Sequence, residues 1–252
     1  MQIELWQAVT LTGVGVLAGF LNVMAGGGSL ITLPVMLFMG LPGPVANGTN
    51  RIAILAQNLS AITAFFRRGF AEFRLSISLA ACAIPGAIVG SMLGVNLEGE
   101  WFNRLLALVM IAVMLIIHFD RNRGPDNPSS EPTRQQLIRG HLLMVAVGFW
   151  GGFIQVGVGF IIMPVLNRIM GLDLVRTNMH KVFIIAVYTA VALAVFASQV
   201  ELLWVFGAAL ALGNVIGGYL GAHFAVSKGE RLIKLILNLV LIAFIVKLLF
   251  FS

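Results

Sequence analysis

Long apolar stretches alternate with short polar breaks along the whole chain. Most of the stretches approach the roughly 20 residues that a helix needs to cross a bilayer, whereas 30–41 and 160–170 are shorter. The apolar segments cover 5–24, 30–41, 45–66, 75–95, 102–119, 140–157, 160–170, 175–199, 202–222 and 232–251. The pattern predicts an all-α polytopic membrane protein with about ten helical segments.

Two glycine-rich breaks interrupt this pattern, one in each half of the chain. The first runs over Gly26-Gly27-Gly28-Ser29, after Asn22 and before Pro34, and the second over Gly157-Val158-Gly159, after Gln155 and before Pro164. A helix broken inside lipid leaves backbone N–H and C=O groups that only protein or a water-filled cavity can pair. Two such breaks in matching places indicate a transporter site between two repeats.

The two halves also match in the order of their other motifs. Asn50-Arg51 in the first half corresponds to His180-Lys181 in the second. Both halves carry a small-xxx-small series, which lets helices pack closely, at Gly86, Gly90 and Gly94 and at Gly213, Gly217 and Gly221. We therefore expect a first transmembrane repeat over 1–119, a polar cytoplasmic linker over 120–139 and a second, inverted transmembrane repeat over 140–252. Each repeat would consist of a glycine-broken helical hairpin and three transmembrane helices.

Composition excludes a soluble domain, because 59% of the residues are hydrophobic, only 10% are charged and the mean hydropathy is +0.98. The net charge of +6 comes from basic residues that lie mostly in loops. If each glycine break turns the chain back, twelve Lys and Arg residues share one side and only Arg104 and Lys247 face the other. Eight parallel spans would divide them eight to six, so the positive-inside rule favours the inverted arrangement, with both termini outside the cell membrane. Nucleic acid is not an expected partner.

Arg51 and Lys181 stand apart from the other basic residues. Each lies about six residues into an apolar helix, where a charge costs several kcal/mol unless it is solvated or paired. Either the two side chains snorkel toward the nearest interface, or they face a central cavity and attract an anion.

Polar and glycine residues accompany this pair on the predicted helices and hairpins. Free N–H groups where the short helices begin would bind oxyanions, and glycine lets the backbone approach a ligand closely. The alternative role for the amides is hydrogen bonding between helices. The other candidate substrate-binding residues are Asn22, Gly26, Gly27, Gly28, Ser29, Asn47, Thr49, Asn50, Gln57, Gln155, Gly157, Gly159, His180 and Tyr188.

Several kinds of chemistry lack the residues that they need. All ten carboxylates lie in loops or near the ends of predicted spans, which leaves His180 as the one candidate proton carrier. No Cys/His/carboxylate cluster suggests a metal site, and no Walker-type loop suggests ATP hydrolysis. We therefore expect neither a cofactor nor an enzyme activity.

Three runs of residues resemble the sulfite exporter TauE/SafE family. They are 19–34, then Val45-Ala46-Asn47-Gly48-Thr49-Asn50-Arg51, and a weaker second copy that includes Val175-Arg176-Thr177 and His180-Lys181-Val182-Phe183. The resemblance implies a bacterial inner-membrane transporter of sulfur-containing anions. Family substrates include sulfite, thiosulfate and organosulfonates such as sulfoacetate.

From these observations we expect a secondary transporter, an exporter, that works by alternating access with an anion site between the repeats. Anion exit could follow the membrane potential or be coupled to protons through His180. A membrane-embedded sulfur-handling protein that delivers substrate to a partner enzyme, and a passive anion channel, are the alternatives. The lipid bilayer and a small sulfur oxyanion or organosulfonate are the expected partners, and a homodimer is compatible with the sequence.

Overall fold

The computed structural model describes residues 3–70, 72–119 and 131–224, which form helices and connecting turns without a strand. The elements are α1 (Leu5–Ala25), α2 (Ser29–Phe38), α3 (Gly43–Arg67), α4 (Phe73–Gly94), α5 (Gly99–Phe119), α6 (Arg134–Phe153), α7 (Val158–Pro164), the π-helical turn η1 (Val165–Ile169), α8 (Leu174–Gln199) and α9 (Trp204–Phe224). The predicted all-α fold is confirmed for these residues. The expected helix over 232–251 lies outside them, as does most of the expected linker.

Five helices are long and apolar enough to cross a membrane, namely α1, α4, α5, α8 and α9. The helices after the two breaks, Ser29–Phe38 and Val158–Ile169, are shorter, as the apolar pattern predicts. α3 is long enough to cross but carries a run of buried polar side chains, so its composition alone does not mark it as a span.

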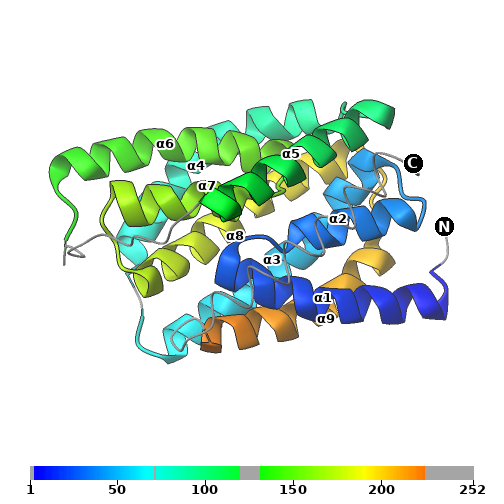
Figure 1. Ribbon diagram of the computed structural model, residues 1–252, viewed down its shortest axis with the longest axis horizontal. Coiled ribbons are helices and arrows are strands. Elements are labelled where there is room, and N and C mark those ends of the chain that lie inside the picture. Colours follow the sequence, from blue (N-terminus) through cyan, green and yellow to red (C-terminus); the bar gives the residue numbers. More distant parts are fainter. Residues whose placement is uncertain (1–2, 71, 120–130, 225–252) are drawn as a thin grey trace.

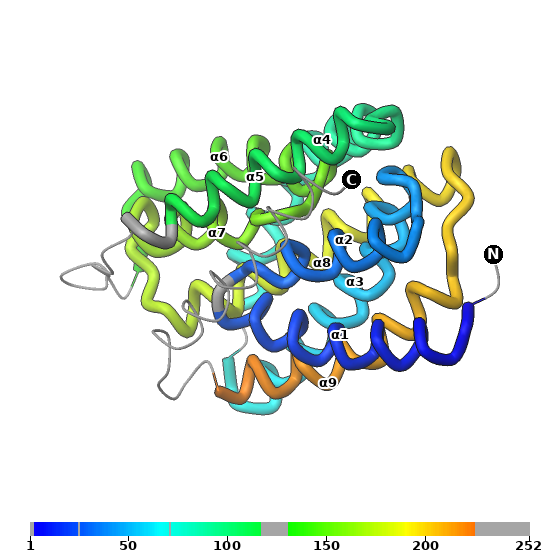
Figure 2. The backbone as a smooth tube through the Cα atoms, turned by 45° about the vertical axis from the view of Figure 1, so that its right-hand side comes forward, coloured from blue at the N-terminus to red at the C-terminus, as the bar shows by residue number. Residues whose placement is uncertain are grey.

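Glycines bring two pairs of helices into close contact, α1 with α9 and α4 with α6 (Figures 1 and 2). A Cβ atom on Gly217 of α9 would meet the carbonyl oxygen of Val16, and one on Gly90 of α4 would meet that of Phe149. The same holds for the other four glycines of the two series. Their predicted packing role is therefore confirmed.

α3 and α8 lie in the middle of the molecule, between these two pairs, and run in opposite directions (Figure 1). Near the start of α3, the Thr49 hydroxyl accepts a hydrogen bond of 3.2 Å from the Leu203 N–H, which follows the end of α8. Near the end of α3, Phe65 packs in one cluster with Met179, which lies near the start of α8.

The helices give the molecule two chemically different ends. The end where α3 stops and α4, α6 and α8 begin, which we call the arginine-rich end, bears Arg67, Arg68, Arg74, Arg134, Arg139 and Arg176. The opposite end, where α3 and α5 begin and α8 stops, bears Glu98, Glu100 and Glu201 together with Arg104. We call it the glutamate-bearing end.

Two element boundaries differ from the sequence expectation. α6 begins at Arg134 rather than at 140, because Thr133 and Gln136 form a capping box in which the Gln136 N–H donates to the Thr133 hydroxyl. The expected helix over 160–170 is divided into α7 and η1 at Pro164, since proline cannot donate the backbone hydrogen bond that would continue a regular helix.

Candidate functional site

The guanidinium of Arg51 is completely buried and bound to the end of α6. Its Nη1 donates to the Gly151 carbonyl at 2.9 Å and to Gln155 Oε1 at 3.1 Å. Its Nη2 donates to the Gly152 carbonyl at 2.5 Å and to Asn47 Oδ1 at 3.3 Å. The Phe196 ring of α8 lies 4.5 Å from the guanidinium carbon, a cation–π distance.

The ammonium of Lys181 is equally buried and is bound to the end of α1. Its Nζ donates to the Val23 carbonyl at 2.7 Å, to the Asn22 carbonyl at 3.4 Å and to Asn178 Oδ1 at 2.7 Å. Met163 Sδ lies 3.8 Å away.

Each cation thus lies on the last carbonyls of a broken helix that comes from the other half of the chain. The final carbonyls of a helix have no partner inside it and carry partial negative charge, so they stabilise a cation. Within the described residues, no carboxylate lies at ion-pair distance from Arg51 or Lys181. Both side chains point into the protein and not to the membrane surface, so the snorkelling interpretation is wrong. We call the two buried cations, Arg51 and Lys181, together with the helix-end carbonyls that hold them, the crossed clasp.

Amide side chains tie the clasp to the central helices. Gln155 Nε2 donates to the Tyr188 hydroxyl at 3.3 Å and to the Thr189 hydroxyl at 3.4 Å. In the first half, Asn22 Nδ2 donates to Gln57 Oε1 at 3.1 Å, and Asn22 Oδ1 accepts from the Gly28 N–H at 3.4 Å. The two residues that precede the glycine breaks therefore have matching positions and comparable contacts.

The backbone turns at both breaks adopt left-handed conformations. Gly26 has φ 81°, and in the second half Gln155 has φ 66° and Gly157 has φ 69°. Gln155 is the one non-glycine residue with positive φ in the described chain. Such a conformation costs a side-chain-bearing residue about 1–2 kcal/mol, and here it directs the Gln155 amide to Arg51 and Tyr188.

Three donor groups of α3 have no hydrogen-bond partner among the described residues. They are Asn50 Nδ2, Arg51 Nε and Gln57 Nε2, and each atom is buried. Buried donors are nearly always paired, and the exceptions occur at functional sites or where a ligand or water binds. Unpaired buried donors of this kind, one of them on a guanidinium, are suited to an oxyanion.

Two cavities lie toward the two ends of α3 and α8. The cavity at the glutamate-bearing end measures about 330 Å³ and is lined by residues that include Val45, Glu98 and Glu201. The cavity at the arginine-rich end measures only about 10 Å³ and is lined mainly by aromatic residues, together with Glu72 and Ser76. Neither cavity is lined by Arg51 or Lys181. The molecule is accordingly more open at the glutamate-bearing end.

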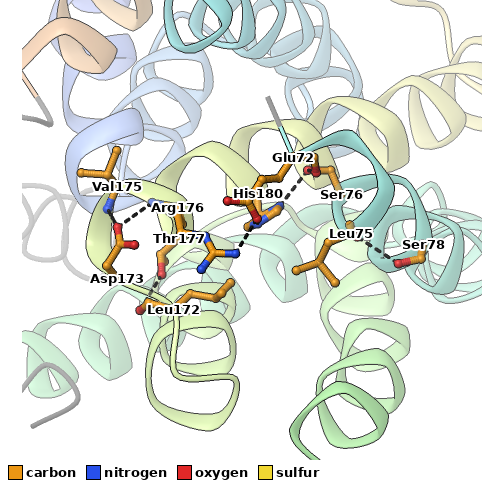
Figure 3. A network of polar contacts seen from close by, with 10 residues as sticks. All are labelled: Glu72, Leu75, Ser76, Ser78, Leu172, Asp173, Val175, Arg176, Thr177 and His180. Atoms are coloured by element: carbon orange, nitrogen blue, oxygen red, sulfur yellow. Dashed lines mark hydrogen bonds and ion pairs between the residues drawn. The ribbon is translucent and has the colours of Figure 1, made fainter. Parts of the chain in front are cut away.

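A polar network at the arginine-rich end involves a residue that the sequence placed in a loop (Figure 3). Glu72 Oε2 lies 2.6 Å from Arg176 Nη2 and 3.5 Å from Nε2 of the buried His180. The other ring nitrogen, Nδ1, is 2.8 Å from the Ser76 hydroxyl. Sequence reasoning missed Glu72 because its position just before an apolar helix is typical of a solvated cap.

The remaining predicted site residues are distributed around the clasp. Thr32 Oγ1 of α2 donates to Asn50 Oδ1 at 2.8 Å, and Asn47 Nδ2 donates to the Phe153 carbonyl at 2.9 Å. Gly27, Gly28 and Ser29 are buried at the start of α2. Thr49 lies toward the glutamate-bearing end with Leu203, and Gly157 faces Val113 of α5.

Comparison with known proteins relates the chain to membrane transporters. The family model described as "Sulfite exporter TauE/SafE" matches residues 11–248. The chain is similar to the probable membrane transporter protein ORF9 of Sinorhizobium sp., with 29% identity over 92% of this chain and 88% of that protein. It is also similar to a probable membrane transporter protein of Haemophilus influenzae, with 28% identity over 88% of this chain and 86% of the relative. YfcA of Escherichia coli K12, another probable membrane transporter protein, is 25% identical over 95% of this chain and 88% of its own length.

Proposed function

Because this chain belongs to the sulfite exporter TauE/SafE family, we propose that it is a secondary transporter that exports a small sulfur-containing anion across the bacterial inner membrane. Sulfite, thiosulfate and organosulfonates such as sulfoacetate are the candidate substrates. All of them carry oxyanion groups that accept several hydrogen bonds, which suits the unpaired buried donors of α3.

The crossed clasp is the observation that carries this proposal. Backbone and amide oxygens hold Arg51 and Lys181, and no carboxylate of the described residues lies at ion-pair distance from either. A permanent anion would interact with either cation more strongly than these oxygens do. An entering anion therefore competes with the carbonyls of Gly151, Gly152 and Val23, and it can release a hairpin from the cation that holds it.

The packing of the helices supports alternating access by two inverted halves. α1 packs on α9 and α6 packs on α4, while α3 and α8 run antiparallel between them, as an inverted repeat requires. Under this proposal, releasing one hairpin while the other stays clasped opens the site to one side at a time.

We assign the arginine-rich end to the cytoplasm, because cytoplasmic loops carry an excess of Lys and Arg. The conformation described is then more open toward the periplasm, where the cavity measures about 330 Å³, and closed toward the cytoplasm by aromatic side chains.

Counterflow in proteoliposomes tests the transport proposal. Vesicles that contain the purified protein and unlabelled thiosulfate should accumulate labelled thiosulfate from outside, and the initial rate should saturate with concentration. Competition by sulfite and sulfoacetate would rank the substrates. A rate that rises linearly with concentration indicates a channel, and no uptake above protein-free vesicles for any of the three anions overturns the proposal.

A further inference from the structure

A carboxylate, an imidazole and a guanidinium meet at the arginine-rich end, and the imidazole is that of His180, which directly precedes Lys181 (Figure 3). We propose that His180 and Glu72 form a proton-binding site whose occupancy strengthens anion binding. This inference rests on the proposed transport function and names a proton-linked control of the same site.

Two hydrogen-bond arrangements are possible around the neutral His180 ring, because the Ser76 hydroxyl lies 3.2 Å from the Glu72 carbonyl oxygen and 2.8 Å from the ring nitrogen Nδ1. If the hydroxyl donates to the carbonyl, Nδ1 carries the ring hydrogen; if it donates to Nδ1, Nε2 carries it. Nε2 is buried, has no hydrogen-bond partner among the described residues and lies 3.5 Å from Glu72 Oε2.

Nε2 faces a carboxylate, so the imidazolium, which carries a hydrogen on both nitrogens, gains a charge–charge attraction that the neutral ring lacks. An N–H at this position would donate a charge-assisted hydrogen bond to Glu72 Oε2 after a small approach. The other charged groups around His180 are Arg176, which holds the same Glu72 oxygen at 2.6 Å, and Asp173, which caps the start of α8. Lys181 is the next residue, but its ammonium is turned to the α1 carbonyls.

Protonation would change both the charge and the connections of this end of the molecule. The imidazolium adds a positive charge next to Lys181, and in the low-dielectric interior this raises the attraction for an anion. It also adds a second charged contact from α8 to Glu72, which Arg176 of the same helix already holds. Proton and anion binding therefore favour each other, and the linkage is reciprocal.

A path for the proton exists in the cavity that Glu72 and Ser76 line. Its volume of about 10 Å³ is close to the space that one water molecule needs. Glu72 itself is partly exposed, with a side-chain exposure of 41%, whereas His180 has none. Glu72 can consequently pass a proton between solvent and the buried ring.

The first half of the chain lacks such a site. The residue that matches His180 is Asn50, which accepts from Thr32 and cannot titrate at ordinary pH. Among the described residues, the proton-binding site is therefore confined to the arginine-rich end. The substitution His180→Asn replaces the imidazole by the side chain that occupies the matching position in the first half. His141 offers a matched control, because its Nε2 lies 3.0 Å from the Ser78 hydroxyl of the same helix α4, and no carboxylate is recorded at ion-pair distance from it in the described part of the chain.

Calorimetric titration of the purified protein with thiosulfate tests the linkage, since thiosulfate keeps its charge between about pH 5.5 and pH 8, the range in which histidine titrates. We expect the Kd to be at least about fivefold lower at the acid end, with proton uptake on binding seen as a dependence of heat on the buffer. His180→Asn and Glu72→Gln should abolish the pH dependence, and His141→Asn should keep it.

Two results overturn the inference while leaving transport intact: a wild-type Kd that does not change with pH, without proton uptake, or a pH dependence that survives in folded His180→Asn protein. If neither variant folds, the absence of proton uptake by the wild type still overturns the inference. Failure of wild-type protein to bind thiosulfate, sulfite or sulfoacetate at any pH is a different outcome, and it removes the proposed function together with this inference.

Discussion

Gly26 and Gly159 meet backbone to backbone, so that the two hairpins touch without a side chain between them. A Cβ atom added to either glycine would clash with the Cα atom of the other. The two glycines come from opposite halves of the chain. Gly26 is the third residue after Val23 and Gly159 the seventh after Gly152, and the carbonyls of Val23 and Gly152 each hold a cation. The hairpins are therefore fixed relative to each other as well as to the cations.

Gly159→Ala should separate the hairpins and impair transport. The added methyl group must displace the Gly26 backbone, and overpacking of this kind costs about 1–3 kcal/mol. We expect a lower thermal unfolding midpoint and a counterflow rate reduced by about tenfold or more, because small displacements at a site have large effects on rate. Gly13→Ala is the control, since nothing lies within 4 Å of a Cβ at that position of α1. Equal behaviour of the two variants would contradict the contact.

Arg51→Ala and Lys181→Ala should each abolish or strongly reduce anion transport in protein that remains in the membrane. Each change removes a site charge and leaves buried carbonyls unpaired, which costs about 1–3 kcal/mol of stability. Anion binding and counterflow should fall by at least about tenfold, as measured on protein that elutes as a single species. Arg104→Ala provides the comparison, because that arginine is exposed and pairs with Glu100 at 2.8 Å. Wild-type rates in both variants would remove the cations from the site.

Two substitutions of Gln155 separate the effect of backbone strain on stability from the effect of its side-chain hydrogen bonds. Gln155→Ala and Gln155→Gly both delete the amide that binds Arg51 and Tyr188. Glycine adopts a φ of 66° without strain, whereas alanine does not, so the glycine variant should be about 1 kcal/mol more stable than the alanine variant. Thermal unfolding measures the difference, and both variants should transport more slowly than wild type. An alanine variant as stable as the glycine variant would mean that the turn carries no strain.

Cysteine labelling should report which end of the molecule is open. In a Cys82→Ser background, a cysteine at Val45 would line the cavity of about 330 Å³, and one at Ile62 would line the cavity of about 10 Å³. A membrane-impermeant maleimide should modify Val45→Cys faster, from the periplasmic side. Addition of thiosulfate should change the ratio of the two rates if the anion releases a hairpin. Faster labelling of Ile62→Cys would reverse the assignment of the open end.

Sequence periodicity predicted the helices well because most of them are long and apolar, and because Gly26, Gly157 and Pro164 interrupt the pattern in a recognisable way. It also identified Arg51 and Lys181, since a charge inside an apolar run is rare. The partners of these cations could not be predicted, because they are backbone carbonyls, such as those of Gly152 and Val23. Every residue has a backbone carbonyl, so the sequence does not distinguish the ones that bind a cation.

The role of Glu72 could not be predicted from the sequence for a different reason. In the sequence it belongs to the polar break after α3, and nothing distinguishes it from the other carboxylates at span ends. Its contact with His180 arises from the packing of α4 against α8, two helices about a hundred residues apart in the chain, and only the fold brings the two groups together.

The crossed clasp also has a consequence for biosynthesis. The ribosome makes α1 first, yet the ammonium that binds its carbonyls and the helix that packs along it, α9, emerge only near the end of the described chain. Until then the nascent amino-terminal half contains a guanidinium without its acceptors and a glycine-lined helix without its neighbour. Contacts between such distant segments form slowly. The amino-terminal half therefore cannot complete its packing before α8 and α9 have been made.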